Sequence, residues 1–90
     1  MKKIVYTKHA EGKLERLRRV GSKVSKNLVA ETVFEPENID FEIDYPKIIA
    51  SRPLDKLHIL RVVFRYEDDK IIIVTLYPAR KGRYYESKKN

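Results

Sequence analysis

Two apolar runs joined by a short polar segment occupy residues 57–85, and they constrain the fold more than any other part of the chain. Both runs are rich in β-branched and aromatic residues, which suit a half-buried pleated surface. The polar segment, residues 67–70, contains three acidic residues and a lysine. This pattern predicts a β-hairpin. Because side chains alternate across a strand, the pairing register of the hairpin decides which residues reach each face.

Two registers are compatible with this hairpin. If residues 67–69 form the loop, Arg61 lies opposite Thr75 and Ile59 lies opposite Tyr77, whereas a loop of residues 68–69 places Val62 opposite Thr75. We favour the first register, because it gathers aliphatic residues on one face and polar residues on the other. The aliphatic face of the second strand then consists of Ile72, Val74 and Leu76, opposite Ile71 and Ile73. The polar face carries Arg61, Arg65, Thr75 and Tyr77.

The N-terminal part of the chain predicts three further elements. Residues 2–6 are typical of a short strand, and Thr7 is suited to cap a helix over residues 8–20 that ends at Gly21. The buried stripe expected for this helix is Ala10, Leu14, Leu17 and Val20. A second helix is predicted from Ser25, its N-cap, to the residue before Pro36.

Residues 39–45 alternate between apolar and acidic side chains, which predicts a half-buried strand with an acidic outer face. Pro46 makes it an edge strand or bends it, and residues 47–50 are candidates to continue it. The expected fold is α+β, with the order β-α-α-β-β-β. Two N-terminal helices pack on one face of a small curved antiparallel sheet. We expect one domain over residues 1–86 and a frayed basic tail over residues 87–90.

The charge of the chain indicates a polyanionic partner. The formal net charge is +7, and residues 8–26 hold seven Lys and Arg against two Glu. Residues 31–47 reverse this balance, with six acids against one lysine. The chain has no Cys, which excludes a disulfide framework and a thiolate nucleophile or metal site. No Gly-rich phosphate loop, metalloprotease motif or metal-ligand spacing is present, and no window is long enough for a transmembrane span. We expect a cytoplasmic protein that needs no cofactor.

The remaining chemistry consists of Arg, Lys, Tyr and one well-placed histidine. His9 lies in the first turn of the first helix, where it could take a proton from a ribose 2′-hydroxyl. Arg61 and Arg65 could grip phosphate, and tyrosines could stack on bases. Each residue also has a simpler interpretation: His9 as a surface residue, the arginines as a solvated strand face, and the tyrosines as the edge of the core.

The motifs YTKHAEGKLERL, VSKNLVAETVFEP and LRVVFRYEDDKIIIVTLYPARKGRYY give the chain a resemblance to a known group. They resemble a family of small prokaryotic domains grouped near the RelE/ParE toxin superfamily, which includes YoeB and BrnT. The resemblance covers about residues 5–85. It implies a RelE-like fold and a metal-independent endoribonuclease that cleaves mRNA, often on the ribosome, and that is neutralised by a cognate antitoxin. In this chemistry a 2′-hydroxyl attacks the neighbouring phosphate and leaves a 2′,3′-cyclic phosphate.

The resemblance also implies roles for individual residues. The catalytic set is His9 as base or acid, Arg61 and Arg80 at the phosphorane, and Tyr77 at the nucleotide. The expected RNA-binding residues are Lys13, Arg16, Arg65, Thr75, Lys81, Arg83 and Tyr84. A second hypothesis uses the same basic surface without catalysis, as a binding module for RNA or for an acidic protein partner. ParE-type relatives act on gyrase rather than on RNA, so fold alone does not decide between these activities.

Overall fold

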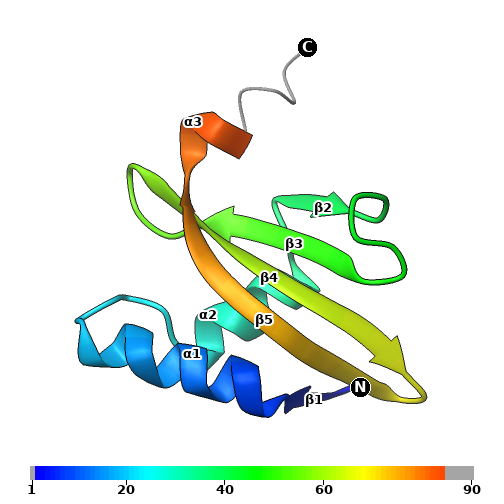
Figure 1. Cartoon of the computed structure of the whole chain (residues 1–90). Helices are drawn as coiled ribbons and strands as arrows, with labels where there is room; N and C mark the ends of the chain where they lie inside the picture. The colour runs from blue at the N-terminus through cyan, green and yellow to red at the C-terminus, as the bar shows by residue number, and fades with distance from the viewer. Residues whose placement is uncertain (1, 85–90) are drawn as a thin grey trace.

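The computed structural model describes residues 2–84, and the side chains of residues 2–82. Expectations for Arg83 and Tyr84 as RNA-binding side chains, and for the tail, lie outside this described part. The elements are β1 (Lys3–Tyr6), α1 (Lys8–Arg19), α2 (Lys26–Phe34), β2 (Asn38–Asp40), β3 (Ile48–Pro53), β4 (His58–Glu67), β5 (Lys70–Arg80) and α3 (Lys81–Tyr84). One five-stranded sheet has the order β1-β5-β4-β3-β2, and α1 and α2 pack on one of its faces (Figure 1).

The predicted α+β class is confirmed, but two features of the predicted topology are wrong. The sheet is mixed, because β1 pairs in parallel with β5, whereas the other neighbours are antiparallel. This pairing joins the two ends of the domain. Because no short turn connects β1 to β5, the sequence gives no local sign that the two strands are parallel. The sheet also has five strands, because the segment expected as one strand over residues 39–45, with a continuation, forms the separate strands β2 and β3.

Both helices begin at the predicted caps. The Thr7 hydroxyl accepts a hydrogen bond from the Ala10 amide at 3.1 Å, and the Ser25 hydroxyl accepts one from the Leu28 amide at 3.1 Å. Gly21 takes the left-handed conformation expected after a helix end, with a φ of 78°. Val20 was expected in the buried stripe of α1, but it is the C-cap residue and is 79% exposed.

The hairpin of β4 and β5 is confirmed, but the favoured register is wrong. Its tip is a two-residue turn, with Glu67 opposite Lys70 and Asp68 in the left-handed region at a φ of 57°. Farther from the tip, Phe64 lies opposite Ile73 but Val63 lies opposite Thr75, so Val74 is an extra residue in β5. This β-bulge shifts the register by one more residue.

The tight turn and the bulge each move the pairing by one residue in the same direction. Arg61 therefore lies opposite Tyr77, two positions from the predicted partner. Because two positions are one full period of a strand, Thr75 and Tyr77 remain on the face of Arg61. The expected grouping fails before the bulge, since Ile71 and Ile73 belong to the core beneath the helices together with Leu76.

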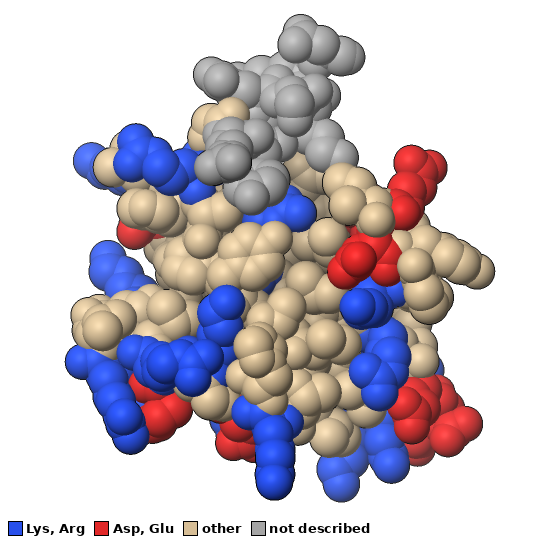
Figure 2. All heavy atoms as spheres, viewed as in Figure 1, with Lys and Arg blue, Asp and Glu red and all other residues tan. Residues whose placement is uncertain are grey.

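The chain between β2 and β3 is a turn rather than the predicted half-buried strand. The Asp40 carboxylate accepts hydrogen bonds from the amides of Glu42 and Ile43, which curls the backbone away from the sheet. Phe41, Ile43 and Tyr45 are therefore exposed. In Figure 2 carboxylates gather on the side of β2, Lys and Arg gather along α1 and near the start of β4, and both kinds of charge lie near the hairpin tip.

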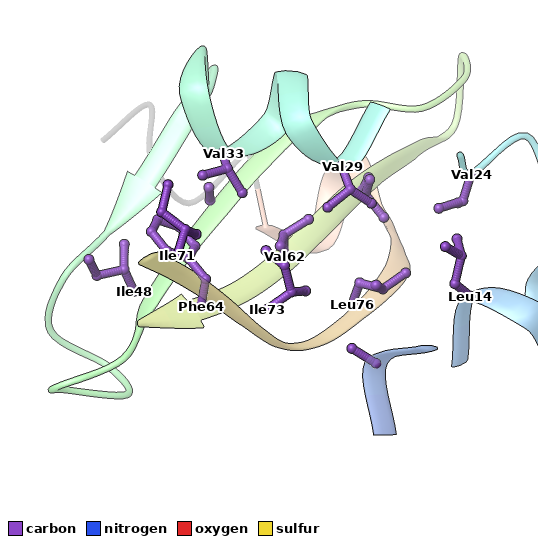
Figure 3. Close-up of a cluster of buried hydrophobic side chains, with 13 residues drawn as sticks. Leu14, Val24, Val29, Val33, Ile48, Val62, Phe64, Ile71, Ile73 and Leu76 are labelled. Carbon is purple, nitrogen blue, oxygen red and sulfur yellow. The ribbon is translucent and has the colours of Figure 1, made fainter. Parts of the chain in front are cut away.

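The hydrophobic core lies between the helices and the sheet (Figure 3). Leu14 of α1 and Val29 and Val33 of α2 pack toward Val62 and Phe64 of β4 and the core residues of β5. Phe64 is 1% exposed and is the largest fully buried side chain. Within residues 2–84 no helix has both the length and the apolar character that crossing a membrane requires.

Candidate functional site

The bulge in β5 fixes where α1 begins. β1 ends at Tyr6, opposite Ile73, and the next amide, that of Thr7, donates to the Ile73 carbonyl at 3.1 Å. The Thr7 hydroxyl also donates to the carbonyl of the bulge residue Val74 at 3.1 Å. Beyond this point β1 no longer covers the edge of β5, and α1 takes its place alongside the strand (Figure 1).

The spacings of the helix and the strand match along this edge. Four residues of an α-helix rise about 6 Å and two residues of a strand rise about 6.6 Å, so side chains at these intervals stay side by side. Nε2 of His9 lies 3.1 Å from Oγ1 of Thr75. One step farther along, Nζ of Lys13 lies 5.7 Å from the centre of the Tyr77 ring.

Arg61 reaches the same tyrosine from β4. Its Nε donates to the Tyr77 hydroxyl at 2.9 Å, and its Cζ lies 5.8 Å from the ring centre. Tyr77 is thus held between two cations, one from a helix and one from the neighbouring strand. We call His9, Lys13, Arg61, Thr75 and Tyr77 the edge cluster.

The side chains of the edge cluster are at least partly exposed. His9 is exposed, and the other four residues are partly buried. Because the Tyr77 hydroxyl accepts from Arg61, its own proton is left to donate elsewhere. The imidazole of His9 can donate or accept at Nε2, depending on its tautomer. The cluster therefore combines two fixed cations with two groups that can exchange protons.

The other predicted site residues lie outside this cluster. Arg65 is on the same face of β4 but nearer the hairpin tip, where its Nη2 lies 3.2 Å from a Glu67 carboxylate oxygen. Arg16 is exposed on α1, one turn beyond Lys13. Arg80 is opposite His58 at the end of β5, and strand alternation directs it to the other face from Tyr77.

A hollow of about 520 Å³ lies on the far side of Tyr77, at the start of β4 and the end of β5. We call it the terminal hollow. Arg80 and Lys81, both predicted from the sequence, line it together with Tyr77, so the tyrosine is a wall shared by the hollow and the edge cluster. The rest of the lining includes Lys56, Leu57, Pro78 and Ala79.

The face of the sheet that carries Arg61 is less polar than the sequence suggested. Strand alternation places four buried aliphatic residues there, and they lie outside the core cluster beneath the helices. These four aliphatic residues are Ile49, Ile59, Val63 and Ile72. The cationic site is therefore restricted to the β5 edge and does not extend over the centre of the sheet.

Two groups outside the edge cluster have shifted pKa values. Partial burial, with a smaller effect of the Glu11 carboxylate, raises the pKa of Tyr6 to about 12. A side-chain hydrogen bond from His58, helped by the amide of Leu57, lowers the pKa of Asp55 below its usual value. Nδ1 of His58 lies 2.9 Å from the Asp55 carboxylate, which shapes the turn into β4. Among the described residues no three His, Cys, Asp or Glu side chains gather as metal ligands.

Comparison with protein-family models, with curated proteins and with solved structures found no significant match for this chain. The geometry of the edge cluster is therefore the basis for assigning a function. Sequence reasoning selected all five of its members but missed the bulge at Val74 and the second hydrogen bond of Thr7. The signal that could have placed these residues together is their spacing. His9 and Lys13 are four residues apart on a helix, and Thr75 and Tyr77 are two residues apart on a strand, so the two pairs have nearly equal separations.

Proposed function

We propose that this protein is a metal-independent endoribonuclease of the RelE-like toxin type. The observation that carries the proposal is the edge cluster. In it an exposed imidazole lies beside Thr75, and two cations lie beside the phenol of Tyr77. A phosphodiester needs cations to stabilise the charge of its transition state and groups that move protons to and from its oxygens. The edge cluster supplies both kinds of group.

The proposed reaction is transesterification within the RNA chain. His9 donates from Nε2 to Thr75, and Nδ1 takes the proton of a ribose 2′-hydroxyl. The 2′-oxygen bonds to the adjacent phosphorus, and the bond from phosphorus to the 5′-oxygen breaks. Tyr77 donates its proton to that oxygen, while Arg61 and Lys13 stabilise the phosphorane and the developing phenolate. The products are a 2′,3′-cyclic phosphate and a 5′-hydroxyl.

The resemblance supplies the remaining parts of the proposal. The substrate is mRNA, bound on the ribosome, and a cognate antitoxin protein neutralises the enzyme in a prokaryotic cytoplasm. The RelE-like arrangement, with two helices on one face and functional side chains on the other, belongs to the same proposal. Arg80 and Lys81 in the terminal hollow and Arg16 on α1 extend the basic path along which RNA would bind.

The test is cleavage of single-stranded RNA, alone and in a translation reaction, by matched variants. We expect His9→Ala and Arg61→Ala each to lower the rate at least about 100-fold, the usual scale of lost acid–base or electrostatic catalysis. Arg65→Ala is the control, because it removes an arginine on the same strand face that already pairs with Glu67. Circular dichroism melting confirms that each variant is folded.

Two results would separate this proposal from the alternatives. Wild-type cleavage that persists in both His9→Ala and Arg61→Ala contradicts the proposed mechanism. RNA binding without cleavage by the wild type favours the non-catalytic binding module instead. In that case the logarithm of affinity should fall with the logarithm of salt with a slope near −3, for about four neutralised phosphates of a single strand.

A further inference from the structure

The turn between β2 and β3 exposes apolar side chains to solvent, although hydrogen bonds fix its backbone. Phe41, Ile43 and Tyr45 are 56%, 75% and 81% exposed. Hydrogen bonds hold the turn from within: Asp40 caps the amides of Glu42 and Ile43 at 2.8 and 3.0 Å, and the Tyr45 amide donates to the Glu42 carbonyl at 3.3 Å. We call residues 40–47 the acidic knuckle.

The acidic knuckle has the wrong charge for RNA and no role in the core. Its three apolar side chains alternate with carboxylates, which repel phosphate. Ordered apolar groups displayed together in this way are typical of a protein-binding surface. Lys47, whose Nζ lies 3.9 Å from the Asp44 carboxylate, offsets only one of the three acidic charges of the knuckle. The complement of the knuckle is therefore a surface that is both apolar and cationic.

That complement is present on the same chain, at the terminal hollow. Leu57 is 58% exposed there, beside Pro78, and Lys56, Arg80 and Lys81 provide the positive charge. The balance of the whole chain agrees: outside residues 31–47, with their six acids and one lysine, the chain has 19 Lys and Arg against seven Asp and Glu. The pairing of opposite charges thus favours a second copy as the occupant.

We propose that the acidic knuckle of one molecule docks in the terminal hollow of a second copy. The two surfaces cannot meet within one molecule, because the knuckle precedes β3 and the hollow follows it, at opposite ends of this strand (Figure 1). The six residues of β3 span about 20 Å. A bound pair therefore keeps one free knuckle, on one molecule, and one free hollow, on the other, which is a head-to-tail contact.

The association is weak and it covers the candidate site. Two aromatic residues bury about 150–250 Å² each, so the knuckle alone falls short of the roughly 800 Å² per partner of a stable interface. Tyr77 lines both the hollow and the edge cluster, so a docked knuckle shields it. If the proposed nuclease activity holds, a docked knuckle and RNA compete for the surface around Tyr77. The self-associated protein, which forms at high concentration, is then the less active form.

Sedimentation equilibrium at low salt, up to about 1 mM protein, tests the docking directly at concentrations where weak interfaces form. We expect the weight-average mass of the wild type to rise past twice the chain mass of 10.7 kDa. The knuckle variant Ile43→Ser/Tyr45→Ser and the hollow variant Leu57→Ser should each remain monomeric. Val20→Ser is the matched control, because it removes an equally exposed aliphatic side chain elsewhere and should associate as the wild type does.

An equimolar mixture of the knuckle and hollow variants gives the decisive result. Only one intact knuckle and one intact hollow can then meet, so the mass should level off at two chains. A wild type that stays monomeric, or a knuckle variant that associates as strongly as the wild type, overturns the proposal. The outcome is independent of the nuclease assay, because a monomeric knuckle variant retains the whole edge cluster and should still cleave RNA.

Discussion

Replacing Thr7 with valine tests how the fold holds the edge cluster together. The Thr7 hydroxyl accepts from the Ala10 amide as the N-cap of α1 and donates to the carbonyl of Val74 in the β5 bulge. Valine keeps the shape of the side chain and removes both hydrogen bonds. His9 follows two residues later, so the same hydroxyl holds the imidazole beside Thr75.

The size of the effect follows from these two bonds. Loss of an N-cap costs about 1 kcal/mol, and loss of one further hydrogen bond costs about 0.5–1.5 kcal/mol. The expected loss for Thr7→Val is therefore about 2 kcal/mol in the free energy of unfolding. For a domain of this length that lowers the melting temperature by about 10 °C. Thr7→Ser retains the hydroxyl and should stay close to the wild type.

Thermal melting followed by circular dichroism measures this loss, and Ser25→Ala provides the comparison. The Ser25 hydroxyl caps α2 through one bond, to the Leu28 amide, so Ser25→Ala should cost about half as much as Thr7→Val. In proton NMR spectra of the folded protein, the chemical shifts of the His9 ring protons should change in Thr7→Val and stay at their wild-type values in Ser25→Ala. A Thr7→Val protein that melts with the wild type, or a Thr7→Ser protein that melts as low as Thr7→Val, would refute this account of the edge.

Three further changes test other parts of the fold. Tyr6 has a folded-state pKa of about 12, above its unfolded value, so its contribution to stability is complete below about pH 10 and is lost as the pH rises toward 12. After allowance for the partial exposure of Tyr6, the loss in the free energy of unfolding is about 1 kcal/mol. Denaturant unfolding should show that this free energy declines less over the same pH window in Tyr6→Phe than in the wild type. An equal decline would contradict the assignment. Phe64→Ala should cost about 3–5 kcal/mol in urea unfolding, since Phe64 is 1% exposed in the core, and a cost below 1 kcal/mol would place the core elsewhere. Gly21→Ala should cost about 1 kcal/mol by the same measurement, because its φ of 78° is strained for alanine; no loss would argue against that helix end.

Local patterns predicted the parts of the fold that depend on local chemistry. The caps at Thr7 and Ser25 and the helix end at Gly21 each follow from side chains within a few residues. Charge and residue type also selected the members of the edge cluster, since few groups in this chain can bind phosphate or exchange protons. Thr75 and Tyr77 were placed correctly on the face of Arg61 although the register was wrong.

The failures involve contacts between distant parts of the chain. The bulge at Val74 contacts Thr7, 67 residues away in the sequence, whose hydroxyl donates to the bulge carbonyl. The parallel pairing of β1 with β5 joins both ends of the described chain and leaves no local signature. Residues 39–45 have the alternation of a strand, but the Asp40 side chain competes for the backbone amides and forms a turn.

The most direct test of the nuclease proposal is cleavage, in EDTA, of an RNA with a single 2′-deoxynucleotide on the 5′ side of a mapped cleavage point. The proposed transfer through the 2′-oxygen predicts that the unmodified RNA yields a 2′,3′-cyclic phosphate and a 5′-hydroxyl, and that the deoxy substitution abolishes cleavage at that bond alone. Equal cleavage of the deoxy-substituted bond, or cleavage of the unmodified RNA only after Mg²⁺ is added, would contradict it.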